Sequence, residues 1–164
     1  MKSFSLLLFF LFLLSASKTD AQEFRLSGSV QILGEINGAF TGFGLGLENP
    51  LGKHFSLSAD VNAGYSDKGR ALAIRPAIHY FLSREQKGFY IGPSVKYIHL
   101  KERLDYDRYQ DELFAVGFSL GAKSKINDRL ILTLDLSPHK TLGGNNEADV
   151  AGISGGISIG YRIQ

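Results

Sequence analysis

Apolar residues alternate with small or polar residues along most of this sequence, and this alternation constrains the fold more than any other feature. In residues 151–163, isoleucine or tyrosine occupies most odd positions, whereas the even positions hold only glycine, serine and one arginine. Residues 55–65, 114–123 and 130–137 show the same division. Side chains of a β-strand point alternately to its two faces, so a period of two indicates strands rather than helices. The sequence therefore predicts an all-β chain whose strands have one apolar face.

Eight such strands account for most of the chain after its first 21 residues. We place them at residues 26–36, 39–47, 54–65, 70–82, 88–100, 112–124, 129–138 and 149–163. The connections at 48–53, 83–87 and 126–128 are short, whereas those at 100–111 and 138–149 are longer and polar. Short turns at one end and longer loops at the other are typical of bacterial outer-membrane barrels. We therefore predict a single eight-stranded, antiparallel, up-and-down transmembrane β-barrel.

The composition of the non-apolar face decides between a membrane barrel and a soluble one. If the apolar residues pointed inward, the outside would consist largely of glycine and serine, with few charges in mid-strand. Soluble surfaces typically carry about 25–35% charged residues. With the apolar face toward lipid, the narrow interior receives the small residues that fit there. A soluble barrel that binds an apolar ligand is the alternative reading.

Charged residues of both signs occupy inward positions of this predicted barrel. Unpaired charges in such an interior are costly, so we expect them to form a paired network. The candidates are Glu35, Asp60, Asp135, Arg75, Lys96, Lys123 and Arg162. If they pair, they fill the barrel; if they line a gap, the protein is a narrow pore for small solutes.

The N-terminus has the pattern of a secretory signal peptide. Lys2 precedes an apolar run at 4–14, which is followed by a polar stretch at 15–20. The run is about half of the roughly 20 apolar residues that a membrane-spanning helix needs. We expect cleavage after Ala21, which leaves the barrel as residues 22–164. The sequence has no cysteine, which excludes disulfides, thiolate metal sites and a lipid-modified cysteine.

Aromatic residues near the predicted strand ends favour interfacial girdles, which are common in membrane barrels. They are Phe40, Phe43, Phe55, Tyr65, Tyr80, Phe81, Phe89, Tyr90, Tyr97, Phe114 and Tyr161. Over its whole length the pattern resembles the small OmpA-transmembrane and OmpX-like barrels and the barrel proteins common in Bacteroidetes. Such barrels usually end in an aromatic residue; here Tyr161 precedes the end by three positions. The resemblance implies the bacterial outer membrane as location, its lipid and lipopolysaccharide as surroundings, and the barrel-assembly machinery as a partner during insertion.

Motifs that suggest chemistry are weak in this sequence. Residues 152–156 fit G-x-S-x-G, but a nucleophile elbow needs a strand-to-helix turn, and Ser154 lies inside an alternating strand. The four histidines lack the spacing of a metal site. We predict no catalytic, cofactor or metal site. A lipid-modifying enzyme with His99, Asp105 and Ser66 at the outer rim is the least favoured alternative.

The segment 100–111 is rich in charge and tyrosine, which makes it the candidate surface-contact loop. Tyr106, Arg108 and Tyr109 are its candidate contacts to a surface protein or host ligand. The chain has 18 basic and 16 acidic residues, a balance that argues against nucleic-acid binding. We therefore predict a non-enzymatic integral outer-membrane protein that contributes to envelope structure or surface interaction.

Overall fold

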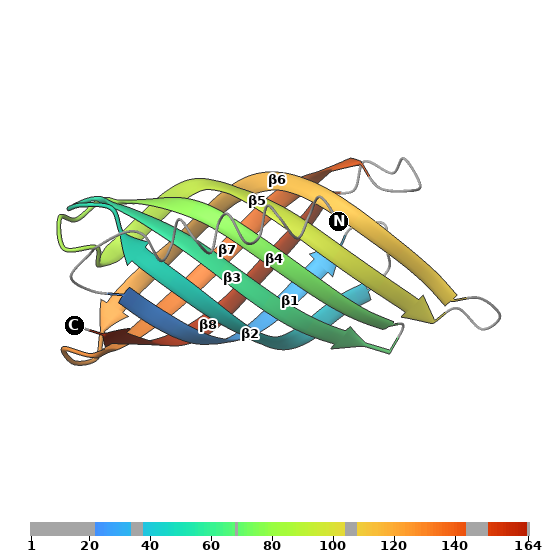
Figure 1. The fold of residues 1–164 in the computed structure, drawn as a ribbon, viewed down its shortest axis with the longest axis horizontal. Helices are drawn as coiled ribbons and strands as arrows, with labels where there is room; N and C mark the ends of the chain where they lie inside the picture. Colours follow the sequence, from blue (N-terminus) through green and yellow to red (C-terminus); the bar gives the residue numbers. More distant parts are fainter. Residues whose placement is uncertain (1–21, 34–37, 68, 104–107, 144–150, 164) are drawn as a thin grey trace.

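Eight β-strands form a closed barrel in a computed structural model of the protein, and β8 pairs back to β1 (Figure 1). The structure describes residues 22–33, 38–67, 69–103, 108–143 and 151–163. All neighbouring strands are antiparallel. The predicted all-β, eight-stranded, up-and-down barrel is confirmed. Within the described residues, no helix is long and apolar enough to cross a membrane.

Strands β1, β2, β5, β6 and β7 are longer than the alternation alone indicated, whereas β3 and β4 have the predicted length and β8 is two residues shorter. Their bounds are β1 Gln22–Leu33, β2 Gly38–Pro50, β3 Phe55–Ser66, β4 Gly69–Phe81, β5 Gly88–Arg103, β6 Arg108–Lys125, β7 Leu130–Gly143 and β8 Ala151–Ile163. A transmembrane strand needs only about 9–11 tilted residues. Each strand is therefore long enough to cross the hydrocarbon core of a bilayer.

Two of the predicted loops are wrong in extent. Strands β5 and β6 stay paired up to Arg103 and Arg108, so the predicted loop at 100–111 is a connection of four residues. Strand β7 continues to Gly143 through the first half of the loop predicted at 138–149. The ladder is made by backbone groups, so it continues through polar sequence once the neighbouring strand is in place. Polarity alone therefore did not mark the ends of these strands.

One end of the barrel, called the turn end here, holds the chain connections 51–54, 82–87 and 126–129. The start of β1 and the end of β8 lie at this end too, because Gln22 pairs with Ile163 (Figure 1). The Gln86 side chain joins two of these turns, since its Nε2 donates hydrogen bonds to the carbonyl oxygens of Gly52 and Phe55 at 2.7 and 2.8 Å. The opposite end is called the far end.

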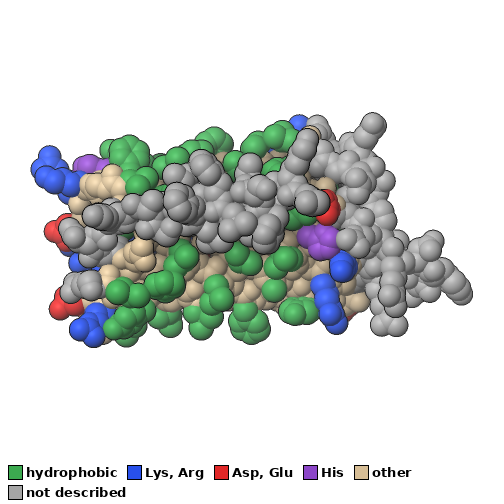
Figure 2. Space-filling model, in the orientation of Figure 1, with side chains coloured by type: hydrophobic (Ala, Val, Ile, Leu, Met, Phe, Trp, Pro, Cys, Tyr) green, Lys and Arg blue, Asp and Glu red, His purple; other side chains and the backbone are tan. Residues whose placement is uncertain are grey.

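The apolar face of the strands points outward. Side chains such as Phe43, Phe89 and Ile157 are 74%, 70% and 57% exposed, whereas Ser58 and Asp60 on the other face are buried. In Figure 2 hydrophobic side chains cover the middle of the face shown, and charged side chains lie toward the two ends; the exposed apolar residues occur on every strand, and together they are called the apolar belt here. The outward orientation predicted from the alternation is therefore the one observed.

Three of the aromatic residues predicted for the girdles lie inside the barrel instead. Phe40, Phe81 and Tyr90 are at most 3% exposed. Each follows the alternation of its own strand: Phe81, for example, comes directly after the outward Tyr80. Exposed aromatic side chains do occur near the strand ends. They include Phe55, Tyr65, Tyr80, Phe89 and Tyr161.

Glycine at position 92 is required by a close approach of two strands. A Cβ atom added at Gly92 would overlap with the backbone carbonyl oxygen of Ile78 in β4. We expect Gly92→Ala to lower the free energy of unfolding by about 1–3 kcal/mol, because the strands must separate to admit the methyl group. Urea titration of the protein in lipid vesicles measures this loss.

The matched control for that substitution is Gly28→Ala in β1. A Cβ atom at Gly28 meets no atom within 4 Å and points away from the barrel. The free energy of unfolding of the Gly28→Ala variant should stay within about 0.5 kcal/mol of that of the parent protein. Equal losses for the two alanine variants would contradict a steric role for Gly92.

Candidate functional site

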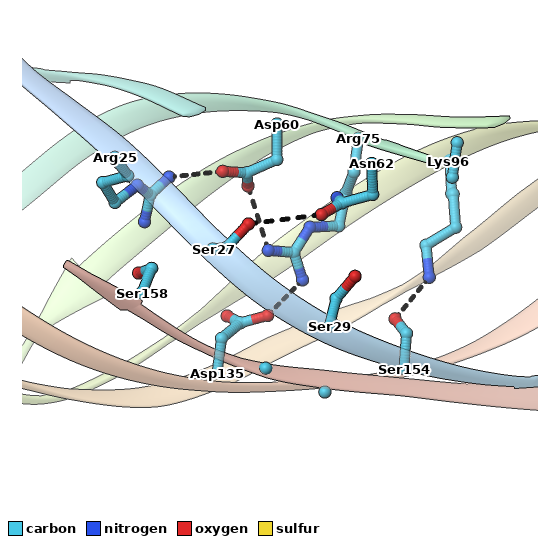
Figure 3. Close-up of a pocket in the computed structure, with 13 residues that line it drawn as sticks. Arg25, Ser27, Ser29, Asp60, Asn62, Arg75, Lys96, Asp135, Ser154 and Ser158 are labelled. Atoms are coloured by element: carbon cyan, nitrogen blue, oxygen red, sulfur yellow. Dashed lines mark hydrogen bonds and ion pairs between the residues drawn. The ribbon is translucent and has the colours of Figure 1, made fainter. Parts of the chain in front are cut away.

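Four charged side chains are linked in a row across the interior of the barrel, from β1 to β7 (Figure 3). They are Arg25, Asp60, Arg75 and Asp135. The Nη2 atom of Arg25 lies 2.8 Å from Oδ1 of Asp60, and the Nη2 atom of Arg75 lies 2.9 Å from Oδ2 of the same carboxylate. The other guanidinium nitrogen of Arg75 pairs with Asp135. Asp135 also accepts a hydrogen bond of 2.8 Å from the Tyr90 hydroxyl. Each of these four charged side chains therefore has an oppositely charged partner.

A second cluster lies nearer the turn end and is joined to the first through Arg25. The Nη1 atom of Arg25 lies 3.1 Å from Oε2 of Glu48. The ammonium of Lys123 lies 2.8 Å from Glu48 and 2.9 Å from Glu23. The hydroxyl of Ser56 donates a further hydrogen bond to Glu48 at 2.6 Å. These side chains are almost fully buried, so the carboxylates depend on their protein partners instead of water.

The ammonium of Lys96 differs from the other buried cations. It donates a hydrogen bond of 2.6 Å to the Ser154 hydroxyl and lies 3.3 Å from Nδ1 of His139. Among the described carboxylates, none comes within 4 Å of it. Lys96 is therefore held by neutral polar groups, although it is only 3% exposed.

Apolar side chains fill the interior on either side of these charges. Toward the far end they form a buried cluster of Phe40, Ala71, Ala73, Ile98, Leu100 and Leu113. Toward the turn end, the rings of Phe81 and Tyr90 lie 5.2 Å apart and those of His79 and Tyr90 lie 4.3 Å apart. The Lys123 ammonium lies 5.5 Å from the Phe81 ring centre. The charged layer is thus enclosed by packed side chains.

The interior cavity beside the charged side chains is small. Its volume is about 50 Å³, and Arg75, Lys96, Ser29 and Ser158 are among the residues that line it (Figure 3). A water molecule needs roughly 10–15 Å³ of such volume, so the cavity has room for no more than a few waters. This part of the interior is filled by side chains and has no room for a hydrated solute.

The residues proposed from the sequence occupy different places in this interior. Asp60, Arg75 and Asp135 are joined directly, Lys123 belongs to the second cluster, and Lys96 lies beside the cavity. The remaining residues are less central. The Nη2 atom of Arg162 lies at the edge, 3.8 Å from Glu23. Glu35 and Tyr106 fall outside the described residues, as do the side chains of Arg108 and Tyr109, whose backbones start β6.

Sequence reasoning missed several members of the network, among them Arg25, Glu23, Glu48 and Tyr90. Their signal was the alternation itself: Arg25 shares its face with Ser27 and Ser29, opposite the outward Leu26. Extending the predicted strands 26–36 and 39–47 by a few residues toward the turn end would have placed Glu23, Arg25 and Glu48 inside. Tyr90 already lay within the strand predicted at 88–100 and was assigned to the girdle because it is aromatic.

The chemical motifs take ordinary structural positions. Ser154 lies within β8, accepts the hydrogen bond from Lys96 and is not followed by a helix, so the elbow geometry of a hydrolase is absent there. His99 of β5 lies 3.9 Å from Glu112 on the neighbouring strand. The described residues include no group of three histidine, aspartate or glutamate side chains that could hold a metal ion.

Comparison with known proteins gives one family and several similar folds. A sequence profile of the family described as "Protein of unknown function (DUF3575)" matches residues 7–138. A search of curated proteins returned no significant match.

Solved structures share the fold at low sequence identity. Neisserial surface protein A is 15% identical with a TM-score of 0.64, over 87% of this chain and 97% of that protein. Ail of Yersinia pestis is 8% identical with a TM-score of 0.61, over 88% and 99%. OprG of Pseudomonas aeruginosa, an outer-membrane protein, is 11% identical with a TM-score of 0.54, over 90% and 97%. The fold of this chain is therefore that of the eight-stranded outer-membrane barrels.

Proposed function

This chain belongs to the DUF3575 family, and we propose from its barrel that it is a non-enzymatic integral protein of the bacterial outer membrane with a closed interior. One observation carries the proposal: an apolar belt covers the outside, while Arg25, Asp60, Arg75 and Asp135 face inward and pair across the interior. A protein of this kind contributes to the structure of the envelope or presents its far end to partners at the cell surface.

The exposed belt supports a location in lipid. Monomeric soluble proteins rarely expose contiguous apolar patches larger than a few hundred Å². Here large apolar side chains are exposed on every strand, from Leu26 on β1 to Ile159 on β8. Hydrocarbon provides no partners for free backbone groups, and a closed barrel leaves no strand edge unpaired. Both properties agree with insertion as a transmembrane barrel, and they speak against a soluble barrel that carries an apolar ligand inside.

The filled interior supports a structural or surface role over transport. The links among Arg25, Asp60, Arg75 and Asp135 cross the lumen, and apolar clusters lie on both sides of them. Conduction would require these buried ion pairs to open, and removing one partner of a buried pair costs about 3–5 kcal/mol.

Partners follow from the location and are part of the proposal. The belt would contact outer-membrane lipid and lipopolysaccharide, and the barrel-assembly machinery would insert the chain. The β5–β6 hairpin at the far end, with Tyr106, Arg108 and Tyr109 at or next to its connection, is the candidate contact to a surface protein or host ligand.

Fractionation and electrophoresis test the location. We expect recovery in the outer-membrane fraction and a change of mobility in SDS on boiling, because a closed barrel stays folded in SDS until it is heated. Recovery in the soluble periplasm without a mobility change would overturn the proposal.

Planar-bilayer recording tests the closed interior. We expect no stable channels from the purified protein, under conditions in which a general porin conducts. Reproducible single-channel currents whose conductance changes in the Arg75→Ser variant would instead show that the protein is a pore.

A further inference from the structure

Two basic side chains lie next to each other on the outer wall of the barrel at its far end. Arg70 of β4 and Lys101 of β5 are register partners, and both are exposed. The guanidinium of Arg70 lies over the ring of Tyr65, 5.8 Å from its centre. Side chains of directly opposed residues on neighbouring strands are close, and like charges in such a pair are destabilising. An anion bound between the two side chains would relieve this repulsion.

The described part of the protein does not supply that anion. No described carboxylate forms an ion pair within 4 Å of Arg70 or Lys101. The carboxylate of Glu112 on β6, which is directly opposite His99, lies 3.9 Å from Nδ1 of that residue. Two exposed positive charges are thus left facing the surroundings of the barrel.

The position of this pair along the barrel selects the kind of anion. On β4, Arg70 is followed on the same outward face by Leu72, which belongs to the apolar belt. The exposed Tyr65, an aromatic side chain of the kind found at membrane interfaces, lies under the guanidinium. Figure 2 shows basic side chains, together with acidic and histidine side chains, beyond the hydrophobic side chains at the end opposite the turn end. The charges therefore lie where hydrocarbon gives way to lipid headgroups.

The orientation of the barrel selects the leaflet. Outer-membrane barrels with an even number of strands keep the start of the first strand and the end of the last strand on the periplasmic side, and here the start of β1 and the end of β8 both lie at the turn end, opposite the far end. Arg70 and Lys101 then face the outer leaflet, whose lipid in Gram-negative bacteria is lipopolysaccharide. Its lipid A part carries phosphate groups at headgroup depth.

We propose that Arg70 and Lys101 bind a phosphate group of lipid A. The guanidinium offers a planar pair of donors that matches phosphate oxygens, and the lysine adds a mobile positive charge. Tyr65 holds the guanidinium over its ring, which restricts the orientations of Arg70. This inference rests on the proposed outer-membrane location and adds a lipid class and a site to it.

The test compares two charge-neutralised variants of the folded protein in detergent. Arg70→Gln/Lys101→Gln removes the proposed site, whereas Arg84→Gln/Lys125→Gln removes two exposed charges at the turn end. Retention of purified bisphosphorylated lipid A is measured by native mass spectrometry. A basic residue near an anionic lipid surface contributes about 1 kcal/mol, so we expect the first variant to bind lipid A about tenfold or more weakly. The control variant should bind like the parent protein.

Two further measurements distinguish a phosphate group of lipid A from free inorganic phosphate as the ligand. Dephosphorylated lipid A should bind the parent protein as weakly as the Arg70/Lys101 variant binds the phosphorylated lipid. Inorganic phosphate at millimolar concentration should not displace lipid A. Equal binding by both variants, equal binding of dephosphorylated lipid, or displacement by inorganic phosphate would each overturn the site. Each preparation is first checked for a mobility change on boiling, so a failure of the barrel proposal is seen separately from a failure of the lipid site.

Discussion

Arg75→Met is expected to lower the free energy of unfolding by about 3–5 kcal/mol, because it leaves buried carboxylates without their partner. Arg75 bridges Asp60 and Asp135 across the interior. Without it, Asp60 retains only Arg25, and Asp135 retains only the Tyr90 hydroxyl among its observed partners. Methionine fills much of the space but supplies no charge. Urea unfolding and refolding in lipid vesicles, followed by SDS mobility, measures the change.

Lys96→Met is the matched control, since it removes an equally buried cation by the same substitution. Lys96 has no described carboxylate within 4 Å, and its two polar neighbours, the Ser154 hydroxyl and His139, both keep a contact with the carbonyl oxygen of Ser137 when it is lost. The expected change is below about 1.5 kcal/mol and can be stabilising, because a buried charge is replaced by an apolar group. If Lys96→Met were as damaging as Arg75→Met, the interior would not be organised around the Asp60–Arg75–Asp135 links.

Ile157→Lys is expected to reduce assembly into membranes strongly. Ile157 is the central residue of β8, points outward and is 57% exposed on the apolar belt. A lysine near the midplane on the lipid face of a barrel costs about 2–4 kcal/mol. The folded fraction after dilution from urea into phospholipid vesicles, read from the unboiled band in SDS electrophoresis, gives the effect.

Ser158→Asn tests the other face of the same strand at the next position. Ser158 is buried and lines the small interior cavity, so a polar amide has room and hydrogen-bonding partners nearby. We expect its folded fraction to stay close to that of the parent protein. Similar losses for the two variants would argue against a lipid-facing belt on β8.

The alternation predicted the parts of the fold that depend on side-chain direction. In β3 and β8 it placed Asp60 inside and Ile157 outside, and in β7 it placed Asp135 inside. These predictions succeed because an error of one residue would expose a whole apolar face to the interior. The same logic predicts much of the charged interior from the sequence alone.

Strand ends and specific partners could not be predicted in the same way. Strand β5 continues to Arg103 because its neighbour β6 is paired there, and pairing between strands is not visible in the composition of either one. Phe81 and Tyr90 were assigned to the girdle because they are aromatic and near strand ends, yet both point inward and pack together. Whether Asp135 contacts Arg75 or Lys96 depends on strand tilt and side-chain rotamers, which a single sequence does not contain.

The pairing of β8 with β1 differs from all other strand pairings because it joins the two most distant strands of the sequence. Seven of the eight strand pairs join segments that follow each other in the chain, whereas Gln22 meets Ile163 from the opposite end. Bringing distant segments together costs chain entropy before any contact is gained. We therefore expect the local hairpins to form early and the seam between β1 and β8 to close last. Until then both seam strands keep a free edge, and that interval is when the chain is most exposed to mispairing with another copy.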